Sequence, residues 1–195
     1  MHSRVHIDGY AAISEDGMLA NAEGVMPASL KVEADQRFFE RELDRADVVV
    51  HGRHSGEDHP NSSLRRRLIL TRQVRAIAPH PSNPNAFLWN PSGAPFAQAL
   101  EAFRTPCSNI GVIGAAGVFE IFLDRYDAFC LSRVSGVLLP GGRPVFPAVP
   151  KHTPEQVLTI HGLERGPNEL SAQDLTITRW RRRGSLDERV ARERP

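Results

Sequence analysis

The feature that most constrains the fold is the alternation of short apolar runs with amphipathic segments along residues 5–134. The runs at 46–50 and 67–70 are short, apolar and bounded by polar residues, which is typical of strands buried in a parallel sheet. Residues 30–43 instead carry apolar side chains spaced about 3.6 residues apart, which is typical of a helix that packs on a sheet. This alternation favours an α/β domain with helices on both faces of its sheet.

The predicted elements continue this alternation almost to the carboxyl end. Residues 18–29 are expected to form a loop, and the runs 158–163 and 175–180 an antiparallel pair that closes one edge of the sheet. We therefore predict one domain over 1–180, followed by a charged, mobile tail over 181–195. The remaining strands are expected at 5–13, 46–50, 67–70, 86–89, 109–113 and 129–134, and the helices at 30–43, 96–103 and 117–123.

Composition and charge exclude several classes of protein. The chain has 195 residues and a net charge of +1, so no global field attracts nucleic acid or an anionic membrane. No apolar run approaches the length of a membrane span or of a secretory signal. Cys107 and Cys130 form no C-x-x-C pair. We expect a reduced, cytoplasmic protein without disulfides and with neither membrane nor nucleic-acid partners.

Two charged or metal-ligating clusters have competing interpretations. The basic run over 179–183 resembles a nucleic-acid contact, but the near-zero net charge favours a solvated tail. The histidines His51, His54 and His59 lie close in sequence, but their spacing matches no zinc motif. We therefore predict no metal site.

The most informative segment for chemistry runs from Asn109 to Glu120. An apolar strand leads into small residues and then into a helix. Small residues let a ligand approach the backbone closely, and the first turn of a helix presents free N–H groups and a positive dipole end. This arrangement suits a pyrophosphate, although a tight strand-to-helix turn that needs small residues for packing would give the same pattern.

Two further strands end in residues that suit phosphate binding. The strand before Gly52 is followed by Arg53, His54 and Ser55, and the strand over 67–70 by Thr71 and Arg72. Arginine recognises phosphate through paired, charge-assisted hydrogen bonds. In an open α/β sheet, ligands bind beyond the carboxyl ends of the strands, where these residues are expected.

The order and spacing of these segments resemble the dihydrofolate reductase superfamily. That resemblance implies a mostly parallel central sheet with an antiparallel C-terminal edge and helices on both faces. It covers most of residues 5–147. The segments that carry it are Met26-Pro27, Gly52-Arg53-His54-Ser55, Val112 to Phe122, Leu131-Ser132-Arg133-Val134 and Phe146-Pro147.

Three other segments resemble a related group, the reductase domain of the bifunctional riboflavin-biosynthesis deaminase-reductase. These are residues 14–20, with Ser-Glu-Asp-Gly-Met-Leu-Ala, residues 45–50, with Arg-Ala-Asp-Val-Val-Val, and the glycine-rich residues 139–146. The zinc signature of the deaminase is missing.

The resemblance implies an NADPH-dependent reductase that transfers hydride to a ribosylaminouracil-like heterocycle. A dihydrofolate reductase acting on a pterin and a non-catalytic nucleotide-binding protein remain as alternatives, and the oligomeric state is left open, with a homodimer as the candidate. The cofactor-binding residues implied are Ala12, Leu19, Gly52, Arg53, His54, Ser55, Thr71, Arg72, Gly114, Ala115, Ala116, Gly117 and Val118.

The resemblance also implies an acid on the first helix that binds the substrate ring. Asp35 is the best match, with Glu33 as the alternative and Ser132 as its hydroxyl partner. Two departures weaken the dihydrofolate interpretation, because Ala28 replaces a tryptophan of that family and Phe119 a tyrosine that lies against its nicotinamide. The peptide bond between residues 114 and 115 is expected to be cis.

Overall fold

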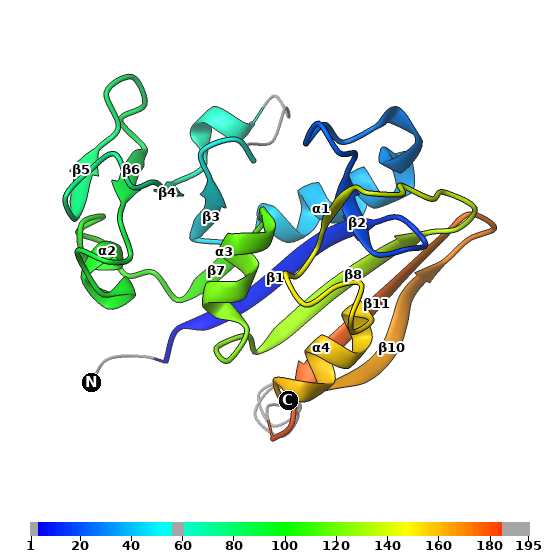
Figure 1. The fold of residues 1–195 in the computed structure, drawn as a ribbon. Helices are drawn as coiled ribbons and strands as arrows, with labels where there is room; N and C mark the ends of the chain where they lie inside the picture. The colour runs from blue at the N-terminus through cyan, green and yellow to red at the C-terminus, as the bar shows by residue number, and fades with distance from the viewer. Residues whose placement is uncertain (1–3, 56–60, 185–195) are drawn as a thin grey trace.

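The computed structural model describes residues 4–55 and 61–184. Within these residues one sheet has nine strands, in the order β10-β11-β8-β1-β7-β3-β4-β6-β5 (Figure 1). Its strands are β1 (His6–Ile13), β3 (Val48–Gly52), β4 (Arg67–Leu70), β5 (Ile77–Pro79), β6 (Ala86–Trp89), β7 (Asn109–Val112), β8 (Ala128–Val134), β10 (Leu163–Ser171) and β11 (Leu175–Arg182).

The strands from β8 to β6 run parallel to one another, which confirms the mostly parallel sheet predicted from the sequence. Strand β11 pairs antiparallel with β8, and β10 with β11, so the predicted antiparallel C-terminal edge is also confirmed. The opposite edge ends in another antiparallel strand, β5, which was not expected.

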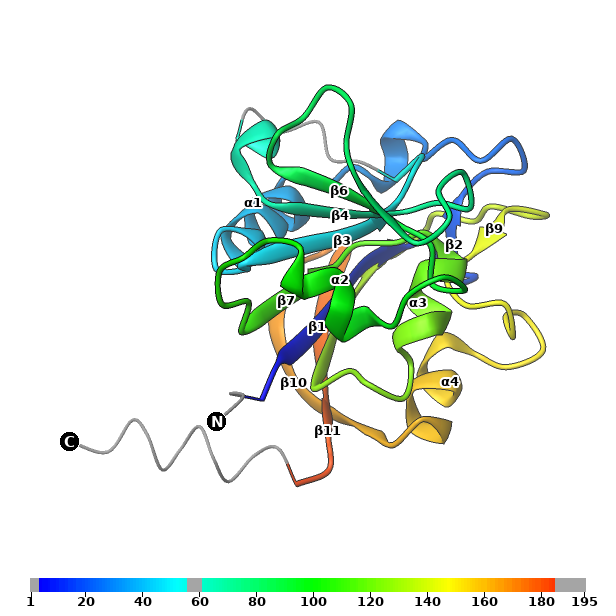
Figure 2. The same cartoon turned by 90° about the vertical axis from the view of Figure 1, so that its left-hand side faces the viewer.

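Helices cover both faces of the sheet, as Figure 2 shows. On one face lies α1 (Glu33–Leu43), whose Phe38 and Leu43 pack against Val49 and Cys130. On the other lie α2 (Phe96–Glu101), α3 (Ala116–Phe122) and α4 (Pro154–Ile160), packed on a larger apolar cluster. Among the described residues, no helix is both long and apolar enough to cross a membrane.

The expected strand over 158–163 is wrong, because most of these residues belong to or follow α4. The hydroxyl of Thr153 accepts from the Gln156 amide at 3.2 Å, the Gln156 side chain accepts from the Thr153 amide at 2.9 Å, and Pro154 begins the helix. This reciprocal cap favours a helix start more strongly than the apolar run that follows favours a strand. Strand β10 begins only at Leu163.

The expected strand over 175–180 is confirmed as β11, which continues to Arg182, past the predicted domain boundary. Residues 185–195 of the predicted tail lie outside the described residues, so the tail stays a prediction. The expected loop over 18–29 contains β2 (Met18–Ala20), which pairs with β9 (Arg143–Pro144), and the start of a 3-10 helix at Ala28–Leu30.

Gly9 in β1 tests the packing of the central sheet. A Cβ at this position would lie 2.3 Å from Cδ2 of Phe129 and 2.9 Å from Cε1 of Tyr126, both fully buried rings. We expect Gly9→Ala to lower the free energy of unfolding by about 1–3 kcal/mol, measured by urea denaturation. As a control, Gly117→Ala in α3 meets nothing within 4 Å and is expected to raise stability by about 0.5–1 kcal/mol. A Gly9→Ala variant as stable as the parent would contradict this packing.

Candidate active site

The carboxyl ends of β7, β3 and β4 lie side by side along the edge of the sheet at which the parallel strands end, here called the carboxyl edge. Val50 lies opposite Val112 of β7, and Gly52 lies opposite Leu70 of β4. The amide of Gly52 also donates to the carbonyl of Gly114 at 2.7 Å. The three segments that the sequence predicts as phosphate-binding therefore leave the sheet at the same edge, although they lie far apart in the chain.

The turn between β7 and α3 leaves an open surface above the first turn of the helix. Gly114 has φ +105°, in the left-handed region, and a Cβ there would lie 3.2 Å from the Phe119 ring. The Gly114–Ala115 peptide bond is cis, as predicted. Helix α3 begins at Ala116, and a Cβ on the exposed Gly117 would meet nothing within 4 Å. A ligand can therefore approach the helix at Gly117, whereas the Val118 amide already donates to the Ala115 carbonyl at 2.8 Å.

The end of β3 at Gly52 lies against this turn. A Cβ at this position would lie 3.4 Å from Cγ2 of Val118 and 3.7 Å from the Ala115 amide nitrogen. The amide of Ser55 donates back to the Gly52 carbonyl at 3.0 Å, so the chain turns at once after the strand.

The predicted phosphate-binding side chains after β3 and β4 are largely exposed. Arg53 and His54 are in contact, with 3.3 Å between Arg53 Nε and His54 Nε2. Arg72 is exposed, whereas the hydroxyl of Thr71 accepts from the amide of Gln73 at 3.1 Å within its own loop. Both guanidiniums are thus placed at the solvent-facing edge of the sheet, where a phosphate can reach them.

Asp35 and Ser132 are brought together across the α1 face of the sheet. Asp35 lies on the first turn of α1 and is half-buried, while Ser132 lies on β8 and is buried. Burial raises the pKa of Asp35, and its hydrogen bond with the Ser132 side chain lowers that pKa by less. Glu33 instead is exposed and pairs with Arg37 at 3.1 Å, so of the two acids only Asp35 faces the sheet.

The two residues expected at the nicotinamide lie at the carboxyl end of β1. Ala12 is directly opposite Ser132 in the neighbouring strand β8. Leu19 lies on β2, which folds back beside β1 because the amide of Ser14 donates to the Met18 carbonyl at 2.9 Å. The predicted site residues therefore span the carboxyl edge of the sheet from β8 to β4.

Phe119 lies beneath the turn that contains Gly114. Its ring is fully buried and packs against Phe129 and Phe146, with ring centroids 5.4 and 6.3 Å apart. The ring therefore belongs to the apolar core beneath the turn.

A polar clamp at the end of β1 was not predicted from the sequence. The carboxylate of Asp16 accepts from the Ser14 hydroxyl at 2.5 Å and from the Leu139 amide at 3.1 Å. Arg133 donates to the Glu15 carbonyl at 2.6 Å and pairs with Glu155 at the start of α4. These contacts tie the turn over 14–17 to the loop after β8. The turn itself can be predicted from Ser-Glu-Asp-Gly, but the residues far along the chain that it contacts cannot.

Comparison with known proteins identifies this architecture. No protein-family model matches the chain, and no curated protein is significantly similar to it in sequence. A protein from Shewanella sp. PV-4 assigned to riboflavin biosynthesis aligns over 92% of this chain and 99% of its own, at 20% identity and a TM-score of 0.64. The dihydrofolate reductase of Enterococcus faecalis, solved with NADP(H) and RAB-propyl, aligns over 94% and 99%, at 14% identity and a TM-score of 0.62.

The chain has the dihydrofolate reductase fold. The diaminohydroxyphosphoribosylaminopyrimidine deaminase/5-amino-6-(5-phosphoribosylamino)uracil reductase of Thermotoga maritima is also similar, at 14% identity and a TM-score of 0.66. That alignment covers 92% of this chain but 57% of the Thermotoga chain. The present chain thus spans little more than half of that bifunctional protein.

The histidines considered as metal ligands have other partners in this reductase fold. His51 is buried in β3, with Nδ1 2.8 Å from the Gly52 carbonyl and Nε2 3.0 Å from Nη1 of Arg67. His59 lies outside the described residues. Over 4–55 and 61–184, no group of three or more histidine, cysteine, aspartate or glutamate side chains is arranged to hold a metal ion.

The raised pKa of Asp35 predicts how stability depends on pH. In the unfolded chain an aspartate ionises near pH ~3.9, whereas in the folded chain ionisation is harder. The folded state therefore loses stability as pH rises from that value through the raised pKa, and the loss is absent at lower pH. We expect Asp35→Asn to match the parent in urea denaturation at the acid end of this range and to be more stable than the parent at neutral pH. A variant less stable than the parent at neutral pH would contradict the burial argument.

Proposed function

We propose that this chain is an NADPH-dependent reductase of the riboflavin-biosynthesis type, which transfers hydride to a ribosylaminouracil-like substrate. The observation that carries the proposal is the arrangement at one sheet edge. An open helix turn and exposed arginines lie beyond β7, β3 and β4, and a half-buried acid with a hydroxyl partner lies over β8, which β1 separates from β7.

The residues at this edge fit a dinucleotide. Gly117 leaves space over the first turn of α3, and Gly52 keeps the adjoining strand end free of a side chain. The segment from Gly114 to Val118 would hold the pyrophosphate through backbone N–H groups. The phosphates and adenosine would be held by Arg53, His54, Ser55, Thr71 and Arg72, and the nicotinamide by backbone groups of Ala12 and Leu19.

When bound, NADPH supplies the hydride. The protein's own part is to bind and orient the substrate ring. The Asp35 carboxylate can accept two N–H groups from the amidine-like edge of a pyrimidine or pterin, and the Ser132 hydroxyl holds that carboxylate in place. Because burial raises its pKa, Asp35 also retains a proton to higher pH than an exposed aspartate and can hold one at the substrate ring.

The similar structures support a pyrimidine substrate more than a pterin. One is described as a pyrimidine reductase-like protein, from Corynebacterium diphtheriae, at 14% identity and a TM-score of 0.63 over 91% of both chains. The Shewanella protein is named for riboflavin biosynthesis, and the Thermotoga protein is named in part as a reductase of a phosphoribosylaminouracil. A pterin remains the second candidate, since the Enterococcus enzyme has the same fold, but Ala28 replaces the tryptophan expected there.

The preference for NADPH over NADH tests the role proposed for Arg53 and Arg72. Two guanidiniums at the adenosine end favour the 2′-phosphate, and one charge-assisted hydrogen bond contributes about 1.5–3 kcal/mol, or roughly tenfold or more in affinity. We expect calorimetry to show NADPH binding at least about tenfold tighter than NADH. Arg72→Ala should remove most of that difference, while Arg125→Ala, an exposed arginine beyond the far end of α3, should leave it unchanged. Equal affinities for the two cofactors in the parent protein would refute the assignment.

Substrate choice is tested by NADPH oxidation with the ribosylaminouracil of riboflavin biosynthesis and with dihydrofolate. We expect turnover with the aminouracil and little with dihydrofolate. Asp35→Asn should lower kcat/KM by about 10–100-fold, because a neutral amide cannot accept two charge-assisted bonds, while NADPH affinity stays near that of the parent. Turnover of dihydrofolate alone would favour the pterin candidate. NADPH binding without turnover of either would favour a non-catalytic nucleotide-binding protein.

A further inference from the structure

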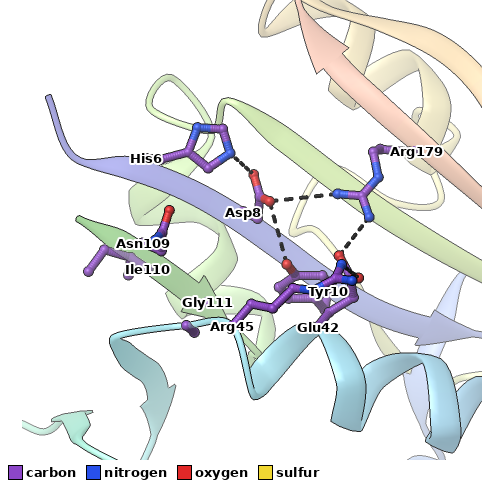
Figure 3. A pocket seen from close by; sticks show the side chains of 10 residues that line it. His6, Asp8, Tyr10, Glu42, Arg45, Asn109, Ile110, Gly111 and Arg179 are labelled. Carbon is purple, nitrogen blue, oxygen red and sulfur yellow. Dashed lines mark hydrogen bonds and ion pairs between the residues drawn. The ribbon is translucent and has the colours of Figure 1, made fainter. Parts of the chain in front are cut away.

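A separate polar cavity lies on the α1 face, beside the first half of β1 (Figure 3). It has a volume of about 190 Å³ and opens where β1 and β7 begin, beneath the carboxyl end of α1. Its lining includes His6, Asp8 and Tyr10 from β1, Glu42 from α1 and Arg179 from β11. Asp8 precedes Ala12 by four positions in a strand, so this cavity and the proposed nicotinamide site lie at opposite ends of β1.

The buried arginine of the cavity is already engaged. Arg179 lies 2.7 Å from a Glu42 oxygen and 2.5 Å from a Glu169 oxygen, and its side chain is 8% exposed. Glu42 is also contacted by Arg45 at 2.7 Å. The short contacts of this cation therefore go to Glu42 and Glu169, and Asp8 receives only a long one, at 3.7 Å.

Asp8 is nine-tenths buried, and the hydrogen bonds that it accepts through its carboxylate are fewer than a buried carboxylate can accept. Its Oδ2 accepts one long hydrogen bond from the Tyr10 hydroxyl, at 3.5 Å, and its Oδ1 forms an ion pair with Nε2 of His6 at 2.9 Å but accepts no hydrogen bond from any described residue. A buried carboxylate is costly unless several short donors satisfy it. Asp8 therefore presents unused acceptor capacity to the cavity.

The cavity wall is closely packed beside Gly111 and includes an aromatic ring. Gly111 of β7 forms part of the lining, and a Cβ there would lie 3.0 Å from Cδ2 of Leu43 and 3.6 Å from Cε2 of Tyr10. The Tyr10 ring is held edge-on to Phe39, with centroids 6.3 Å apart. Burial and then the neighbouring Asp8 raise the pKa of Tyr10, so its hydroxyl stays protonated and adds no negative charge.

We propose that this cavity binds a small organic cation, an amidinium or guanidinium, whose N–H groups donate to Asp8. A planar cation with several donors matches an under-satisfied carboxylate beside an aromatic ring. A metal ion is disfavoured, because the described residues hold no cluster of three ligating side chains suited to one. An anion is disfavoured because Glu42 and Glu169 already neutralise Arg179.

The test uses the full chain and two probes of the same shape, benzamidinium and neutral benzamide. In a titration monitored by ¹⁵N NMR, we expect benzamidinium to shift the amide signals of Asp8, Tyr10 and Gly111. Benzamide is expected to bind with an affinity at least about tenfold lower. Asp8→Asn should abolish this preference for the cation. Glu169→Gln, which removes a carboxylate of the same cluster from outside the cavity lining, should retain it.

Benzamidinium also resembles the amidine-like edge of the substrate that we propose Asp35 binds. The positions of the shifted amides therefore distinguish binding in this cavity from binding at Asp35. Asp35→Asn should leave the shifts at Asp8 and Gly111 unchanged, whether or not NADPH binds at the other site. The proposal is overturned if no shifts occur at these positions in the parent protein, if benzamide binds as well as benzamidinium, or if the shifts lie only around Asp35. Because mapping is done on the parent protein, the result stands even where Asp8→Asn fails to fold.

Discussion

The hydrogen bond from the Gly52 amide to the Gly114 carbonyl, 2.7 Å long, fixes the arrangement on which the candidate site depends. It joins the end of β3 to the turn before α3, where a Cβ at position 52 would lie in van der Waals contact with Val118. Because β4 continues the parallel pairing on the other side of β3, its following loop reaches the same edge. Backbone N–H groups and exposed guanidiniums from distant segments thus face one region, where a polyanionic ligand can be bound without rearrangement of the sheet.

Much of this fold was predictable because buried parallel strands are continuous apolar runs and the helices between them are amphipathic. The elements that were predicted wrongly or missed are those whose sequences do not follow these two patterns. Leu158 and Ile160 are apolar but helical, since the capping box at Thr153 begins a helix that the apolar residues alone do not reveal. Strand β10 lies at the sheet edge and is mostly exposed, so it lacks the alternation that marks a half-buried strand.

The candidate site was predictable to the extent that its residues follow strands directly. Arg53, Arg72 and the small residues after β7 are placed by local spacing, and Asp35 by resemblance to a known family. The second cavity could not be predicted, because Arg179 and Glu42 are 137 positions apart and no local pattern pairs them. A charged residue such as Asp8 within an apolar strand marks an unusual position, but its partners come only from the tertiary structure.

The central claim is that a dinucleotide binds across the ends of β7, β3 and β4. A ¹⁵N NMR titration with NADPH tests it most directly, because each amide at this edge reports separately. We expect large shifts for the amides of Ala115 to Val118, together with Arg53 and Arg72. We expect none at Asp8 or Gly111, which line the polar cavity at the other end of β1. Shifts absent from the turn over 114–118 at saturating NADPH, or confined to other surfaces, would contradict it.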